Sequence, residues 1–148
     1  MPSTYTSINI HVIFSTKLRQ PILPRHALPR IHEYLGGALR SMGCLPLRVG
    51  GIEDHVHILA RFGATACLAN VVRDLKRSST KWIREELAVT GFSWQEGYAA
   101  LSVSSERLAV VERYIARQAE HHRKISAKDE LLKLLAYAQI EFDSKYLE

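Results

Sequence analysis

The chain has few cysteines and no long apolar run. Cys44 and Cys67 are isolated and have no CxxC spacing, which argues against a disulfide framework or a cysteine-based zinc finger and suits a reducing compartment. No apolar stretch approaches the roughly 20 residues that a membrane-spanning helix needs. Residues 1–16 lack the basic start and the small-residue cleavage site of a secretory signal. We therefore expect a soluble, cytoplasmic protein with no membrane partner.

Internal repeats, low-complexity tracts and linkers are also missing. The 148 residues are therefore expected to form a single domain, with a core over about 5–125 and a helical extension over about 126–148. An apolar fraction of 47% with 24% charged residues is typical of a globular protein. The net charge of +5 favours a polyanionic partner, nucleic acid before membrane.

Hydrophobic periodicity predicts four strands and four helices. Strands are expected at 7–16, 44–49, 55–61 and 94–104, and helices at 28–42, 65–87, 106–124 and 128–139. The order strand, helix, strand, strand, helix, strand is the split βαβ, or ferredoxin-like, pattern of an α+β protein. We expect a four-stranded or slightly larger antiparallel sheet with helices on one face, an open second face, and additional C-terminal helices.

The motif His55-Val56-His57 is the most informative part of the chain. Side chains alternate between the two faces of a strand, so the two imidazoles stand on one face about 7 Å apart and can bind one metal ion. Two histidines without a ligand are the alternative, because a His-x-His pair also arises by chance. His11, on the neighbouring predicted strand, is expected to be a hydrogen-bonded core histidine.

A second group lies on the third predicted helix. Tyr114, Gln118 and His122 are spaced four residues apart and share one helix face. The alternative is a tyrosine at the edge of the core with a solvated glutamine and histidine. In the functional interpretation, Gln118 completes a metal site with His55 and His57, Tyr114 lies beside the metal, and His122 is an auxiliary residue. Two imidazoles and an amide suit Mg²⁺ or Mn²⁺ acting on a phosphodiester.

Basic residues form the polar face of the predicted helix 65–87 and also follow the first strand. Such a face can track a DNA backbone, although a simply solvated helix face is equally compatible with the pattern. The candidate DNA-binding residues are Lys17, Arg19, Arg73, Lys76, Arg77 and Lys81.

These motifs resemble those of the HUH-type single-tyrosine transposases of the insertion sequence 200/605 family. The resemblance rests on His55-Val56-His57 after the turn Gly50–Asp54, and on the segment from Tyr114 to Gln118. It extends to segments 10–17, 75–79 and 94–98, and so covers about residues 5–125. It implies that Tyr114 is the nucleophile and that His55, His57 and Gln118 are the metal ligands.

The resemblance also implies a reaction and partners. Family members cut single-stranded DNA at hairpin-forming ends of a mobile element, form a covalent 5′-phosphotyrosine with a free 3′-hydroxyl, and then rejoin strands. They are typically homodimers in which the tyrosine helix of one subunit completes the site of the other in trans. Two alternatives stay open from the sequence: a non-catalytic nucleic-acid-binding module, and a host-recruited nickase of the same family that acts on repeats.

Overall fold

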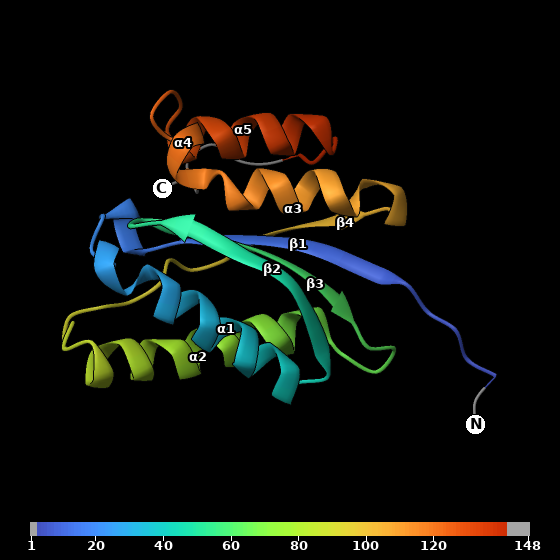
Figure 1. Ribbon diagram of the computed structural model, residues 1–148, viewed down its shortest axis with the longest axis horizontal. Helices are drawn as coiled ribbons and strands as arrows, with labels where there is room; N and C mark the ends of the chain where they lie inside the picture. Colours follow the sequence, from blue (N-terminus) through green and yellow to red (C-terminus); the bar gives the residue numbers. More distant parts are fainter. Residues whose placement is uncertain (1–2, 142–148) are drawn as a thin grey trace.

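The computed structural model describes residues 3–141, in which four strands form an antiparallel sheet of order β2-β3-β1-β4 (Figure 1). The strands are β1 (Ile8–Ser15), β2 (Cys44–Ile52), β3 (His55–Phe62) and β4 (Ala99–Val103). This is the α+β, ferredoxin-like sheet that the sequence predicts. Residues 142–148 of the predicted C-terminal extension lie outside the described residues.

Helices lie on both faces of the sheet (Figure 1). One face carries α1 (Leu28–Ser41) and α2 (Leu68–Glu86), and the other carries α3 (Leu108–Ala116), α4 (Gln118–His121) and α5 (Ala127–Tyr137). Three short 3₁₀ helices, η1 (Lys17–Arg19), η2 (Arg25–Ala27) and η3 (Ser105–Arg107), lie in the connections. The expectation of an open second face is wrong, because α3 to α5 cover it.

Side chains alternate between the two faces of each strand, and buried residues on both faces explain why helices pack on each side of the sheet. Val12, Phe14, Val56 and Ile58 belong to the apolar core that includes side chains of α1 and α2. On the opposite face, His11 pairs with Leu59 across β1 and β3, and both side chains are buried. A sheet with buried residues on both faces requires a helical layer on each side. Among the described residues, no helix is long and apolar enough to cross a membrane.

Two predicted elements differ from the structure at positions where the backbone changes direction. The strand predicted at 94–104 begins only at Ala99, because Gly97 turns the chain with a φ of 79° and Trp94 forms only an isolated bridge with Thr16. The helix predicted at 106–124 is interrupted at Arg117, where φ is −103° and ψ is 22°, so that α3 and α4 are separate.

A glycine allows α3 to lie directly on the backbone of β2. Gly50 pairs with His57 across β2 and β3, and a Cβ atom at Gly50 would lie 2.6 Å from the carbonyl oxygen of Ile115. Ile115 itself is buried. Because Tyr114 precedes Ile115, this close approach of backbone to backbone fixes the height of Tyr114 above the sheet.

Candidate active site

The two histidines of β3 lie side by side in the layer between the sheet and helices α3 to α5. The exposed fractions of His55 and His57 are 1% and 0%, and their ring centroids are 5.0 Å apart. The sequence prediction that they share one face is therefore confirmed. Full burial means that each ring nitrogen needs a partner within the protein or a bound ion.

The Nδ1 atom of each clustered imidazole contacts a different partner. His55 Nδ1 is 2.7 Å from Asp54 Oδ1, and His57 Nδ1 is 2.7 Å from His11 Nε2. His122 Nδ1 donates to the carbonyl oxygen of Ile125, at 2.6 Å. Metal-binding histidines usually have such an outer partner on the nitrogen that does not bind the metal. The Nε2 atoms of all three rings are consequently directed toward one another.

His11 is the hydrogen-bonded core histidine that the sequence predicts. Burial, together with the nearby His57, lowers the pKa of His11 to about 3, so its imidazole is neutral. A pair of neutral imidazoles can keep the shared proton on either ring. His57 Nε2 can therefore either donate a proton or offer its lone pair to a metal ion.

Tyr114, Gln118 and His122 come together despite the interruption at Arg117. Gln118 Oε1 lies 3.1 Å from His55 Nε2 and 2.9 Å from His122 Nε2. The rings of Tyr114 and His57 meet edge to face with centroids 5.7 Å apart. The structure thus brings the predicted nucleophile, the predicted amide ligand and the auxiliary histidine to the two strand histidines.

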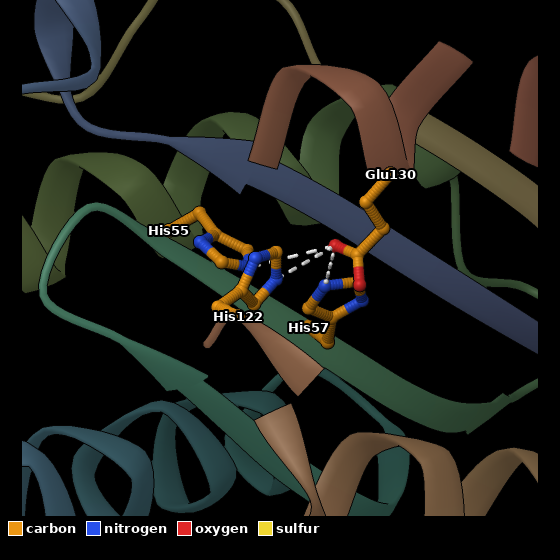
Figure 2. A group of neighbouring side chains, drawn as sticks. All are labelled: His55, His57, His122 and Glu130. Atoms are coloured by element: carbon orange, nitrogen blue, oxygen red, sulfur yellow. Dashed lines mark hydrogen bonds and ion pairs between the residues drawn. The ribbon is translucent and has the colours of Figure 1, made fainter. Parts of the chain in front are cut away.

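Glu130 of α5 is the residue that sequence reasoning missed. Its carboxylate is 3% exposed and points at the three imidazoles (Figure 2). The Oε1 atom is 2.8 Å from His57 Nε2, 3.3 Å from His122 Nε2 and 3.5 Å from His55 Nε2. No pattern in the sequence distinguishes Glu130 from the exposed Asp129 beside it, because the leucines of α5 are the only periodic signal there.

The second carboxylate oxygen of Glu130 contacts the candidate nucleophile. Glu130 Oε2 accepts hydrogen bonds from Tyr114 Oη and, at 3.2 Å, from Gln118 Nε2. His121 Nε2 lies 3.1 Å from the same oxygen. One carboxylate therefore connects the imidazole group with the tyrosine hydroxyl.

The electrostatics of the cluster favour a cation. Burial alone would lower the pKa of His55, but hydrogen bonds to Asp54 and Glu130 raise it to about 9, so that the ring is an imidazolium. Burial lowers the pKa of His57 to about 4, and that ring is neutral. Hydrogen bonds from the histidines outweigh burial and hold the pKa of Glu130 well below its ordinary value. The carboxylates of Asp54 and Glu130, whose pKa values are both held below their ordinary range, would therefore attract a cation to the cluster.

The donor atoms fit a divalent metal ion. One donor atom from each of His55, His57, His122 and Glu130 lies within 4.8 Å of the other three. Metal–ligand bonds of about 2.0–2.2 Å set neighbouring donors about 3–4.3 Å apart, so a small contraction is enough. Gln118 Oε1, beside two of the imidazoles, is a further donor.

The DNA-binding candidates lie in two places. Lys76 donates to the carbonyl oxygens of Gln95 and Gly97, and Arg73 pairs with Asp74 at 3.0 Å. All candidates on α2 lie on the face of the sheet opposite α3 to α5, where Lys76, Arg77 and Lys81 line a hollow of about 590 Å³. Lys17 and Arg19 form part of η1, and Arg19 lines a hollow of about 350 Å³ together with His55. The structure thus brings Arg19 near the cluster and separates the α2 residues from it.

Comparisons with known proteins identify the family and agree with the fold. The family model described as transposase IS200-like matches residues 4–118. A chain from Deinococcus radiodurans R1 assigned as a transposase has a TM-score of 0.64 and 21% identity, covering 80% of this chain and 95% of that one. A REP-associated tyrosine transposase bound to a REP hairpin has a TM-score of 0.60 and 10% identity, covering 84% and 74%. These two structures share the fold, and no curated protein matches significantly.

The family match covers most of the residues on which the site depends. His55, His57, Tyr114 and Gln118 lie within residues 4–118, whereas His122 and Glu130 follow that segment. Because the match spans more than half of the sequence, the chain belongs to the IS200-like transposase family.

Proposed function

We propose that the protein is a metal-dependent transposase of single-stranded DNA in which Tyr114 is the nucleophile. The observation that carries the proposal is the contact of one buried carboxylate, Glu130, with both the Tyr114 hydroxyl and His57. A hydroxyl beside a metal-binding group is the arrangement that phosphodiester attack requires.

Tyr114 attacks the phosphorus of a phosphodiester through its Oη atom. A bond forms between Oη and phosphorus, and the bond from phosphorus to the 3′ oxygen breaks. The products are a 5′-phosphotyrosine and a free 3′-hydroxyl, whose oxygen takes its proton from solvent. Burial and the neighbouring Glu130 carboxylate raise the pKa of Tyr114 above its ordinary value, so the hydroxyl keeps its proton until attack. Glu130 Oε2 accepts a hydrogen bond from this hydroxyl and so orients Oη beside the metal-binding group, and the proton that Oη releases on attack passes to solvent water.

The metal ion would be held by His55, His57, His122 and Glu130, with Gln118 as a further donor. When bound, it would withdraw charge from the scissile phosphate and stabilise the transition state. Of the two metals that the sequence suggests, this donor set favours Mn²⁺ over Mg²⁺, because Mg²⁺ prefers an octahedral shell of oxygen atoms.

The substrate that we propose is single-stranded DNA with hairpin-forming ends. The relative bound to a REP hairpin supports a DNA hairpin as partner. The resemblance implied a homodimer with sites completed in trans, but here the nucleophile and the candidate ligands come from one chain. We therefore favour a site that is complete in cis.

The decisive experiment is the detection of a covalent adduct. The protein is incubated with Mn²⁺ and labelled single strands of the DNA that flanks its own gene, and the adduct is resolved on a denaturing gel. Tyr114→Phe should abolish the adduct at a cost of about 1.5–3 kcal/mol in stability, because one hydrogen bond to a buried carboxylate is lost. Tyr5→Phe, at an exposed tyrosine, is the matched control. An adduct with Tyr114→Phe excludes Tyr114 as the nucleophile, and tight metal-independent binding without any adduct favours the non-catalytic module.

A further inference from the structure

A large hollow opens directly beside the candidate nucleophile. Its volume is about 890 Å³, and it lies between β4, α3 and α5. Tyr114, Glu130 and His11 contribute to its wall, so the hollow borders side chains that contact the imidazole cluster. A volume of this size falls within the range of about 300–1,000 Å³ that is typical of small-ligand sites.

Exposed apolar side chains gather around this hollow. Val110, Tyr137 and Ile140 line it and are 43%, 78% and 39% exposed. Exposed apolar groups around a concave surface indicate a binding site more strongly than scattered ones do. Tyr137 in particular presents an aromatic ring to solvent at the edge of the hollow.

Charged and backbone groups narrow the class of ligand. Arg107 of η3 and Lys133 of α5 line the hollow, so cations are supplied by two elements. The strand β4 is at the edge of the sheet, and no described strand pairs with its outer backbone groups. Apolar walls, an aromatic ring, cations and backbone groups that no described strand pairs with together match an unpaired nucleotide: a base to stack, base edges to hydrogen-bond, and phosphates to neutralise.

We propose that the hollow between β4, α3 and α5 binds one unpaired nucleotide next to the phosphate that Tyr114 attacks. The base stacks on Tyr137, and the flanking phosphates lie near Arg107 and Lys133. This inference rests on the proposed function, which supplies single-stranded DNA as the ligand. It adds the place where the strand is held beside the nucleophile.

Binding is measured with cleavage disabled. In the Tyr114→Phe background, fluorescence anisotropy reports the Kd for a labelled oligothymidylate of about 12 nucleotides, a length that covers a typical single-strand site. Adding Tyr137→Ala should weaken binding about 5- to 100-fold, because loss of one stacked base has effects of that size. Adding Tyr5→Ala, at another exposed tyrosine, should leave the Kd within about twofold. Adding Lys133→Ala should reduce the salt dependence of binding by about one phosphate contact.

A photochemical experiment locates the base. An oligothymidylate in which one thymine is replaced by 5-iodouracil should cross-link to Tyr137 on irradiation, as identified by mass spectrometry. Equal affinity of the Tyr137→Ala and Tyr5→Ala proteins, or no binding of the oligonucleotide by the parent protein, overturns the proposal. A dimer that Tyr137→Ala dissociates, seen by sedimentation, also overturns it, because the hollow is then an interface between two copies of the chain.

The outcomes separate this inference from the proposed function. If the protein forms the Tyr114 adduct but Tyr137→Ala changes neither binding nor adduct formation, the inference fails and the proposed function stands. If no adduct forms while Tyr137-dependent binding persists, the hollow binds a nucleotide and the catalytic proposal fails.

Discussion

Replacing Gly50 with alanine tests whether the contact between α3 and β2 sets the geometry of the active site. A Cβ atom at Gly50 would lie 2.6 Å from Ile115 O and 2.8 Å from Ile115 Cγ2. The oxygen belongs to the backbone, so rotation of a side chain cannot relieve the overlap. The residue before Ile115 is Tyr114, so the strain acts directly beside the candidate nucleophile.

The structure gives the size of the displacement. Ordinary van der Waals contact begins at 3.4 Å, so α3 and β2 must separate by about 0.8 Å at Gly50. Overpacking of this kind costs about 1–3 kcal/mol of stability, and a shift of about 1 Å between reacting groups costs up to about 100-fold in rate. We expect Gly50→Ala to lower the free energy of unfolding by about 1–3 kcal/mol and the rate of adduct formation by about 10- to 100-fold.

Urea denaturation measures the first effect, and the denaturing-gel adduct assay measures the second. Gly37→Ala in α1 is the control, because a Cβ atom there meets nothing within 4 Å. Alanine at that helical position should stabilise the protein by about 0.5–1 kcal/mol and leave the adduct rate unchanged. Wild-type stability together with a wild-type adduct rate for Gly50→Ala would refute the role that we assign to this contact.

Three other predictions concern the assembly, the ligands and the pH dependence. Mixing Tyr114→Phe protein with His57→Ala protein should form no more adduct than either alone, because we propose a site that is complete in cis; restored adduct would show that sites are shared. Glu130→Gln should weaken Mn²⁺ binding, measured by calorimetry, by at least the roughly 10- to 100-fold that loss of an outer partner of a ligand costs. Asp129→Asn should leave the affinity unchanged, and an unchanged affinity for Glu130→Gln removes Glu130 from the ligand set. Burial lowers the pKa of His32 from 6.5 to about 4, so on acidification the unfolded chain takes up a proton before the folded one. The stability that the neutral His32 contributes is therefore fully present above pH 6.5 and is lost as the pH falls toward 4. The loss of unfolding free energy is up to about 3 kcal/mol. His32→Gln should flatten the curve of unfolding free energy against pH between 6.5 and 4, measured by urea denaturation. An unchanged slope would show that His32 does not cause the pH dependence.

The sequence predicts the fold well where burial alone determines the pattern. The stripe from Leu28 to Leu39 predicts α1, and the alternation of Val56, Ile58 and Ala60 predicts β3 with its core face. Predictions fail where one backbone angle overrides the pattern, as at Gly97 before β4. The cover on the second face of the sheet also could not be predicted, because it depends on how α3 to α5 pack against residues distant in sequence.

The candidate site likewise contains residues that the sequence predicts and one residue, Glu130, that it does not. Local geometry brings His55 and His57 together on one strand, and helical spacing brings Gln118 toward them. Glu130 belongs to a separate helix, and its place is determined by the turn between α4 and α5. Ser126 begins α5 by accepting a hydrogen bond from the backbone N–H of Asp129, but a cap fixes where a helix begins and not where it packs.

The buried position of Glu130 links the packing of α5 to the charge of the imidazole cluster. In the described part of α5, Glu130 and Leu135 are buried and Leu131, Leu132 and Leu134 are half-buried, so the contacts of Glu130 add to apolar packing in holding this helix in place. A carboxylate that is 3% exposed is stable only when positive charge or hydrogen-bond donors face it. Without a metal ion, the protonated His55 and the N–H groups of neighbouring rings supply them. A bound metal ion would supply the charge instead, and the rings would then give up those protons. The same carboxylate would thus hold α5 in place in both states and, through its hydrogen bond from Tyr114, keep that hydroxyl beside the site.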